Sequence, residues 1–196
     1  MAAAEPSAAK TSLVAAASSR LWLAGDSTLH PFTINATKFE AAAGLDGSFA
    51  AGSAEARAAV LGGALKSLSL SVPVADLKSG DAGLDKNMRK ALQQDRAPVI
   101  RFTLADYKTA EAKDGSLIVK ARGRLAIAGV EKDTVVEGAC RFGPDGLEVT
   151  GANDVLMSDF GIKPPTMMLG TIKTADKVVV HFDLKLKASD AAPAVK

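Results

Sequence analysis

The sequence predicts a single all-β domain, in which about eight antiparallel strands and one helix form a closed barrel or a two-sheet sandwich. Three observations predict it. Apolar and polar residues alternate with a period of two through most of the chain. Turn sequences separate the alternating runs. The length of 196 residues fits one domain, and one segment alone shows helical periodicity.

The two ends of the chain differ in composition from its middle. Residues 1–18 are rich in alanine and serine and predict a disordered lead, and residues 188–196 predict a disordered tail. The folded domain is therefore expected at residues 19–187. The 37 alanines supply a large part of the 47% hydrophobic residues, so we expect one core. No apolar run approaches the ~20 residues that cross a bilayer.

Three strands are expected before the helix, at residues 21–24, 32–39 and 67–74. The third shows the clearest alternation, because leucine and valine occupy one phase and serine occupies most of the other. Such a pattern is typical of a strand with one face in the core and one in water. Pro73 suits the end of that strand or a sheet edge.

The single helix is expected between Asp81 and Asp95. Leu84, Met88, Ala91 and Leu92 follow a helical spacing and share one face. Asp81 is a favourable N-cap, and Pro98 prevents the helix from continuing far.

Further alternating runs predict the second half of the barrel. Glycine-containing turns at 114–115 and 144–146, and a polar turn at 175–177, separate several of them. The five strands are expected at 100–105, 119–127, 135–142, 147–157 and 178–187.

The apolar phase of these strands contains small residues, including Gly123, Gly138 and Gly151. Small inward residues can leave room for a long, dry cavity, which would select an apolar ligand. They can equally mark bulges or bends in a barrel that is packed solid. The composition leaves both interpretations open.

Few residues suggest catalysis or metal binding. One cysteine, Cys140, and two histidines leave little for a metal site, and the net charge of +2 with mixed signs disfavours a nucleic-acid partner. The residues Gly25-Asp26-Ser27 resemble the nucleophile block of an esterase family, but they also suit a turn. An ester hydrolase is therefore kept as an alternative that needs a histidine near Ser27.

The segment 157–170 interrupts the alternation and mixes phenylalanine, isoleucine, three methionines and two prolines. Methionine adapts to irregular apolar surfaces, including binding sites. The segment is expected to cover one end of the barrel, either as a flap or as a hydrophobic plug.

Three stretches of the sequence carry a further signal. The first reads VPVADLKSG at 72–80, LDKNM at 84–88 and PVIRF at 98–102. The second reads GRLAIAGV at 123–130, and the third reads DFGIKPPT at 159–166 with Gly170. Together they resemble the YceI-like family of lipid-binding barrels. The start, from Gly25 to Phe32, suggests a branch of the family rather than its commonest form.

The resemblance implies an extended, eight-stranded, lipocalin-like antiparallel barrel with one α-helix and short helical turns. It further implies an elongated cavity for a polyisoprenoid or similar amphiphile and export to the bacterial periplasm or outside the cell. The first residues contain no signal peptide, and their Ala-rich character fits a processed exported protein or a cytosolic one. The family supplies no catalytic residue and no cofactor.

We therefore predict a non-enzymatic protein that binds, carries or stores an isoprenoid or fatty-acid-like lipid. A head group would meet Arg101, Lys163 or His30 at the mouth. The alternative is a solid-cored structural or interaction barrel, and a homodimer is left open; stable membrane insertion is not expected. The residues expected to line the cavity are Trp22, Phe32, Ile34, Leu68, Leu70, Met88, Ile100, Phe102, Val119, Val136, Met157, Phe160, Met168 and Phe182.

Overall fold

The computed structural model describes residues 10–167 and 172–189. Within them the chain forms two α-helices, α1 (Ala54–Leu61) and α2 (Ala82–Ala91), and two 3₁₀ turns, η1 (Val74–Asp76) and η2 (Met157–Phe160). The strands are β1 (Lys10–Ala15), β2 (Arg20–Ser27), β3 (Phe32–Ala36), β4 (Glu40–Asp46), β5 (Leu65–Pro73), β6 (Leu77–Lys78), β7 (Val99–Glu111), β8 (Leu117–Ile127), β9 (Val130–Gly143), β10 (Gly146–Leu156), β11 (Thr166–Met167) and β12 (Ile172–Ser189).

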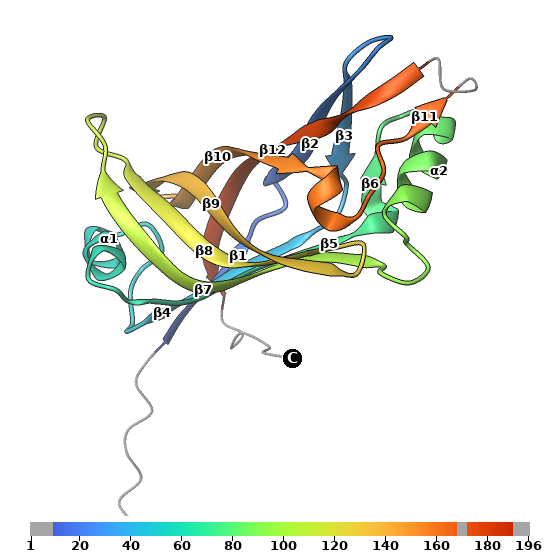
Figure 1. Ribbon diagram of the computed structural model, residues 1–196. Helices are drawn as coiled ribbons and strands as arrows, with labels where there is room; N and C mark the ends of the chain where they lie inside the picture. The colour runs from blue at the N-terminus through green and yellow to red at the C-terminus, as the bar shows by residue number, and fades with distance from the viewer. Residues whose placement is uncertain (1–9, 168–171, 190–196) are drawn as a thin grey trace, which may run out of the picture.

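The strands form a closed, eight-stranded antiparallel barrel (Figure 1). The order β1-β4-β5-β7-β8-β9-β10-β12 closes on itself because β12 also pairs with β1. At the other end of β12, the chain adds β2, β3 and β6 to the same sheet. Strands β1 and β2 therefore follow one another along β12. The predicted all-β barrel is confirmed.

The register places the predicted alternation as expected on the two faces of the wall. On β8, Leu117, Val119 and Ala121 are buried, whereas Lys120 and Arg122 between them are exposed. The register shifts between Leu104 and Asp106 of β7, so that the alternation stays in phase with β8 on both sides of the irregularity.

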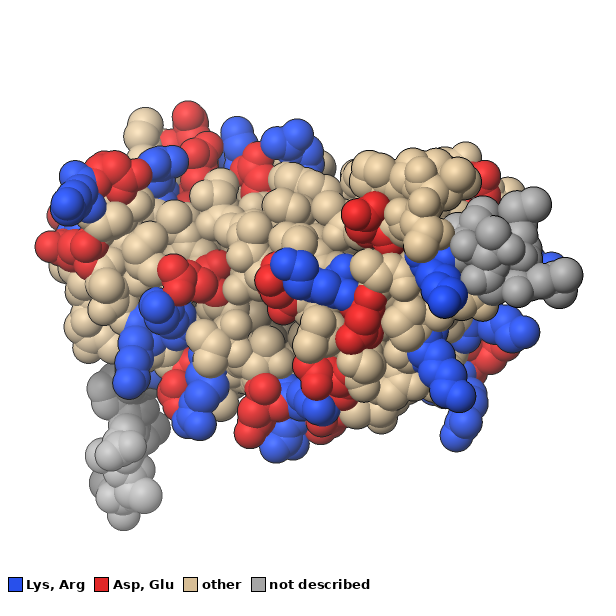
Figure 2. All heavy atoms as spheres, turned by 45° about the horizontal axis from the view of Figure 1, so that its top comes forward, with Lys and Arg blue, Asp and Glu red and all other residues tan. Residues whose placement is uncertain are grey.

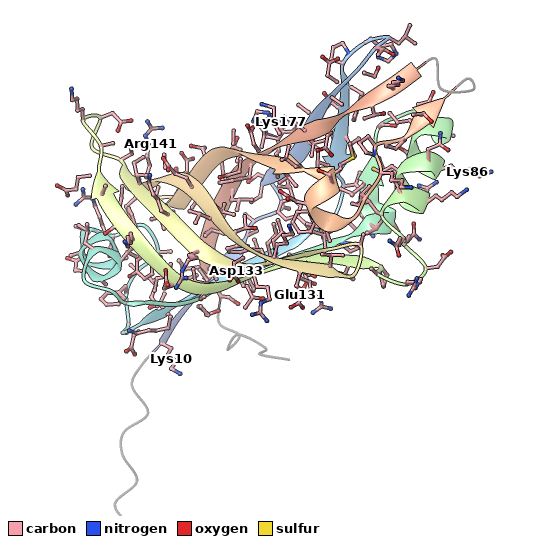
Figure 3. The ribbon with its side chains drawn as sticks, viewed as in Figure 1. Lys10, Lys86, Glu131, Asp133, Arg141 and Lys177 are labelled. Atoms are coloured by element: carbon pink, nitrogen blue, oxygen red, sulfur yellow. The ribbon has the colours of Figure 1, made fainter. Side chains whose placement is uncertain are left out.

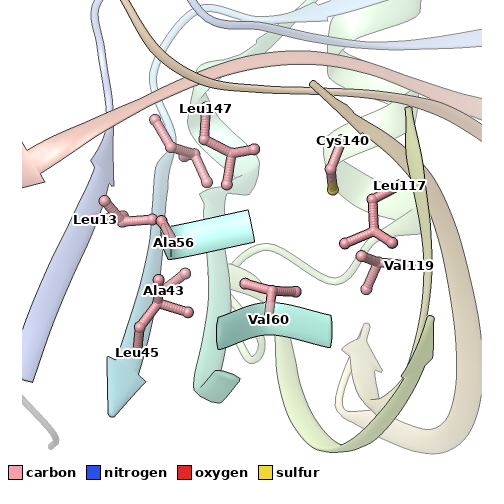
Figure 4. Close-up of a cluster of buried hydrophobic side chains, with 10 residues drawn as sticks. Leu13, Ala43, Leu45, Ala56, Val60, Leu117, Val119, Cys140 and Leu147 are labelled. Atoms are coloured by element: carbon pink, nitrogen blue, oxygen red, sulfur yellow. The ribbon is translucent and has the colours of Figure 1, made fainter. Parts of the chain in front are cut away.

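One end of the barrel is packed solid by the cluster shown in Figure 4. Leucine, valine and alanine side chains from five strands, together with Cys140 of β9, meet Ala56 and Val60 of α1. The hydroxyl of Tyr107 donates to the carbonyl oxygen of Val60 at 2.7 Å and accepts from the amide of Leu65 at 3.2 Å. These bonds hold both ends of the α1–β5 connection against the wall.

The opposite end is closed around α2. Met88 of this helix packs with Leu21, Ile34, Val72 and Leu77 in a second cluster. The N-cap predicted from the sequence is present, because the Asp81 carboxylate accepts from the amide of Leu84 at 2.7 Å. The helix is also tied to the strand before it, since Asp85 accepts from both the amide and the hydroxyl of Ser79. The helix prediction is thus confirmed.

The predicted disordered lead is wrong over residues 10–15, which form β1. This strand pairs with β4 and β12, and its Thr11 and Leu13 are only 7% and 2% exposed. The strand is hard to recognise in the sequence because β1 has only six residues and its partner β4 has alanine at three of seven positions, so neither shows strong hydrophobic alternation. At the other end, β12 extends through Ser189, two residues into the predicted tail. Residues 1–9 and 190–196 of the predicted lead and tail lie outside the described residues.

The helix α1 is a second correction, since one α-helix was expected. Only Ala56 and Val60 of this helix are buried, and half of its eight residues are alanine. An apolar stripe of two residues is too short to stand out in a region rich in alanine. Its N-cap is nevertheless favourable, because the Ser53 hydroxyl accepts from the amide of Ala56 at 3.1 Å.

The outer face of the barrel carries charges of both signs, which Figure 2 shows interspersed across one side of the molecule. Many of them pair between neighbouring strands, such as Lys120 with Glu137 at 2.9 Å and Lys185 with Glu148 at 3.5 Å. Across residues 10–167 and 172–189, no helix combines the length and the apolar character that a membrane span needs.

Candidate functional site

The glycines of the inward phase do not leave empty space beside the rings that cover them. A Cβ added at Gly123 would lie 2.6 Å from Cζ of Phe102, and one added at Gly138 would lie 3.3 Å from Cε2 of Phe182. The same Phe182 ring occupies the space over Gly151. These glycines therefore make room for two phenyl rings inside the wall. This role differs from both interpretations left open by the sequence, an empty cavity or a bend in the strand.

Beside the Met88 cluster, several inward side chains are only partly covered. Leu23 and Val180 face each other across β2 and β12, and both are half-buried, as are Leu70 and Phe182. In a barrel packed solid along its length, inward aliphatic residues are expected to be fully buried. These four side chains, which we call the middle layer, pack against that cluster and keep part of their surface uncovered.

The predicted lining residues occupy several different places. Ile34, Met88, Phe102, Val119 and Phe160 are fully buried in the packed clusters or against the wall. Those on the inward phase that are partly exposed are Phe32, Leu68, Leu70, Ile100, Val136 and Phe182, and Met157 is half-buried as the first residue of η2. Met168 lies outside the described residues.

Trp22 is the exception, because it lies on the outer face of the barrel. It follows Leu21, which is buried inside, and its ring stacks on His181 of β12 with centroids 5.1 Å apart and planes 6° apart. The guanidinium of Arg20 lies 5.5 Å from the Trp22 ring centroid on the same face. The prediction that Trp22 lines the cavity is therefore wrong.

The three residues expected at the mouth are not brought together. Arg101 is exposed on the outward phase of β7, and Lys163 is exposed in the segment after η2. His30 lies in the β2–β3 turn, where its Nδ1 is 2.9 Å from the carbonyl oxygen of Pro31. The three side chains thus belong to three different elements, and a head-group contact by any one of them stays a prediction.

The barrel wall is split over half the length of β9 and β10. The ladder between these strands runs from the Gly143–Gly146 turn to the pair Ala139–Thr150 and ends there. Beyond that point β9 continues to pair with β8 and β10 with β12, so the two strands separate, as Figure 1 shows. We call this gap, between residues 130–138 and 151–156, the β9–β10 split.

One side chain bridges the split where it begins. The Asn153 amide accepts a hydrogen bond from the backbone N–H of Glu137 at 2.9 Å and donates to the carbonyl oxygen of Glu137 at 3.2 Å. The side chain thus makes the two bonds that a partner strand would otherwise make. Further along, Lys132 of β9 lies 3.2 Å from the carboxylate of Asp159 in η2.

A pocket of about 410 Å³ lies in the split. Figure 3 labels two of the charged residues that line it, Asp133 of β9 and Lys177 of β12. Its lining also includes Leu125, Thr134 and Val155, which belong to the inward phase of their strands, and Phe160 of η2. A pocket bordered by residues from both faces of a sheet lies within the wall itself.

The η2 segment closes the inner side of this region. Phe160 and Ile162 are 4% and 5% exposed and pack with Ala128 of the β8–β9 turn. Leu92, next to the end of α2, is part of the same cluster. Within the described part of the predicted flap or plug, the burial of Phe160 and Ile162 favours the plug.

Sequence reasoning did not identify the residues of the split. Lys132 and Thr134 continue the inward phase of Val136 and Gly138 toward the start of β9. The available signal was the presence of polar residues at positions that continue an apolar phase. That these positions face inward became clear only from the pairing of β9 with β8.

The esterase motif is a turn. The Ser27 hydroxyl donates to the carbonyl oxygen of His30 at 2.8 Å and accepts from the amides of Leu29 and His30. His181 is stacked on Trp22 rather than placed near this hydroxyl. Burial raises the pKa of the Cys140 thiol to about 12, so this cysteine is a poor nucleophile. Within residues 10–167 and 172–189, no cluster of three or more His, Cys, Asp or Glu side chains could hold a metal ion.

The closed wall, the helices at its ends and the partly uncovered interior define an all-β, lipocalin-like barrel. The sequence profile of the YceI-like domain matches residues 11–186, so the chain belongs to the YceI-like family, as its sequence resemblance predicts. No curated protein matches the chain.

Solved structures share this fold at low sequence identity. BcnA of Burkholderia cenocepacia is 18% identical with a TM-score of 0.64, over 86% of this chain and 95% of that one. A polyisoprenoid binding domain from Saccharophagus degradans, implicated in plant cell wall breakdown, is 15% identical with a TM-score of 0.63, over 91% and 98% of the two chains. A YceI protein of Campylobacter jejuni is 18% identical with a TM-score of 0.56, over 81% and 85%.

Proposed function

We propose that the barrel binds a single long apolar chain, such as a polyisoprenoid or a similar amphiphilic lipid, in the middle of its interior. The observation that carries this proposal is the incomplete burial of the inward residues that pack against the Met88 cluster, seen at Leu23, Leu70, Val180 and Phe182. These side chains offer apolar surface to a guest, and no polar group is needed to hold its chain.

The family supports the same class of ligand. The chain belongs to the YceI-like family, and one structure with the same fold is described as a polyisoprenoid binding domain. The function proposed is binding, transport or storage rather than catalysis. The export to the periplasm that the family resemblance implies is part of the proposal, and fractionation of the native host would test it.

Burial of the chain can supply useful affinity without a specific polar contact. Each buried methylene contributes about 0.8 kcal/mol, so ten methylenes outweigh the usual costs of immobilising a ligand. The ligand is therefore expected to be chosen by chain length and width more than by its polar group.

The proposal is tested by blocking the interior with one large side chain. Val180 faces inward opposite Leu23, whereas its neighbour Val179 is outward and opposite Ala24. Val180→Trp should lower the affinity for a fluorescent geranylgeranyl probe at least tenfold, and Val179→Trp should leave it unchanged. Native mass spectrometry and organic extraction of the purified protein give an independent measurement. Absence of both probe uptake and extracted lipid in the unmodified protein would reject the function.

A further inference from the structure

The axial ends of the barrel are poorly placed to admit a ligand. The α1 end is packed by the ten-residue cluster that includes Leu13, Leu117 and Val60. The α2 end is packed by the Met88 cluster, and η2 lies with the β8–β9 turn and the end of α2 in a third cluster. A long chain that reaches the middle of the interior through either end would have to displace one of these cores.

The β9–β10 split offers a shorter path. There the wall lacks the strand-to-strand ladder, and the 410 Å³ pocket is lined both by the inward Leu125 and Val155 and by the outward Asp154 and Leu156. Val155 is in phase with Gly151, over which Phe182 of the middle layer lies. The pocket therefore reaches from the outer face of the wall to Leu125, Val155 and Phe160 of the η2 cluster.

The rim of the split is apolar as well as charged. Val135 of β9 and Leu156 of β10 are 54% and 42% exposed, although both are large hydrophobic side chains. They lie on the two strands that separate, one on each side of the opening. An apolar rim lowers the cost of bringing an alkyl chain across the wall.

Among the described residues, few hydrogen bonds or ion pairs connect the two sides of the split. Asn153 bonds the backbone of Glu137, and Lys132 pairs with Asp159 of η2. The second pair crosses from β9 to the segment that follows β10, and both partners are about half exposed, so it contributes little stability. The other ion pair at this pocket, Lys177–Asp154, joins β12 to β10 and does not cross the split.

We propose that the β9–β10 split is the lateral opening through which an isoprenoid or alkyl chain enters and leaves the barrel, with η2 as its inner plug and the Lys132–Asp159 pair as its latch. This inference rests on the proposed function, and it adds the route of exchange. Opening separates β9 from η2 and leaves the ladders of β9 with β8 and of β10 with β12 in place.

A reversible crosslink across the split tests the route. Thr134 and Val155 both line the pocket, one on each strand, and are replaced by cysteine. The protein is first loaded with an NBD-labelled geranylgeranyl probe and then treated with a bis-maleimide that contains a cleavable disulfide. Release into phosphatidylcholine vesicles should become at least tenfold slower and recover after reduction. Cys140 is buried and its pKa is raised to about 12, so it does not compete for the reagent.

The matched control is a crosslink where the wall is already continuous. Ala139 and Thr150 face each other in the last pair of the β9–β10 ladder, and cysteines there should leave release unchanged. Equal release before and after crosslinking at 134 and 155 would overturn the lateral opening. Failure to load the probe at all would instead reject the proposed function, because loading precedes the crosslink.

The latch has its own matched pair of variants. Asp159→Asn removes the tie across the split, and Asp154→Asn removes the same charge from the pair that does not cross it. Asp159→Asn should speed both uptake and release about threefold with little change in the dissociation constant, as expected for a surface ion pair. Equal rates in the two variants would reject the latch.

Discussion

The phenyl ring of Phe182 covers Gly151 across the β10–β12 ladder, and the two residues are direct partners in the register. A Cβ at Gly151 would meet this ring and would also lie 2.5 Å from the carbonyl oxygen of Glu137. The glycine thus permits both the inward ring and the close approach of β9, just before the two strands separate.

We expect Gly151→Ala to lower the free energy of unfolding by about 2 kcal/mol, because the added methyl group overpacks a site that backbone and ring already fill. Urea denaturation measures the loss. Gly143→Ala is the control, since nothing lies within 4 Å of a Cβ at that glycine. Phe182→Leu in the Gly151→Ala background should recover only part of the loss, because the contact with Glu137 remains. Equal stability of the two alanine variants would contradict this account.

Tyr107→Phe should destabilise the α1 end of the barrel by about 1–2 kcal/mol. The variant leaves the carbonyl oxygen of Val60 and the amide of Leu65 without the phenol that bonds them both. Hydrogen exchange at Leu65 should become faster, while the α2 region keeps its protection. Thr103→Val removes a hydroxyl from the exposed face of the same strand and should have little effect. Unchanged exchange at Leu65 in Tyr107→Phe would count against the role of the phenol.

Trp22 should be a poor reporter of ligand binding, since it lies outside the wall against His181. It is the single tryptophan of the chain, so its emission can be assigned without ambiguity. We expect addition of a non-fluorescent isoprenoid to leave the emission maximum of the natural protein unchanged. In a Trp22→Phe background, Phe182→Trp places the reporter inside, and its emission should shift to the blue on binding. A blue shift in the emission of Trp22 itself would contradict its outward position and indicate that it lines the cavity.

Asn153→Ala should loosen the start of the split. It removes both hydrogen bonds to the backbone of Glu137, and we expect the stability to fall by about 1–2 kcal/mol. The measurement that distinguishes a local effect is hydrogen exchange at Glu137, which should speed up much more than exchange at Ala139, still within the ladder. Thr150→Ala on the same strand, an exposed position, serves as the control. Uniform acceleration across β9 would indicate a global loss of stability instead.

The β7–β8 turn should add a pH-dependent contribution to stability. Hydrogen bonds from the Ser116 hydroxyl and amide, and then from Arg141, lower the pKa of Asp114 from 3.8 to about 2. Because the folded-state pKa is depressed, the contribution is complete above the unfolded pKa and is lost as the pH falls toward 2. The stability difference between the natural protein and Asp114→Asn should therefore shrink between pH 5 and pH 2.

The control for these pH measurements is Asp145→Asn. This variant also removes one carboxylate, but in the turn that joins β9 and β10. Urea unfolding at each pH gives the two differences. A difference for Asp114→Asn that stays constant down to pH 2 would show that these hydrogen bonds do not favour the charged carboxylate.

The family resemblance and the local sequence patterns correctly predicted those helices and strands whose own residues show a clear apolar pattern. Alternation along β5 and β8 and the capped face of α2 report which side of an element meets the core, and both depend on residues close in sequence. Where the signal was weak, in the six-residue β1 and the Ala-rich α1, the prediction failed. Such segments contain too few large apolar side chains to show which face is buried.

The sequence by itself therefore determined the class of fold, the helix α2 with its cap and the apolar character of the inner face. Only the tertiary structure decided on which face Trp22 lies, because the run Leu21, Trp22, Leu23 and Ala24 is apolar at every position and has no phase until β2 pairs with β12. It also decided that Phe182 fills the space over Gly151, and that the wall parts between β9 and β10. Each depends on pairing between distant strands, and register across a barrel is set by its closure as a whole.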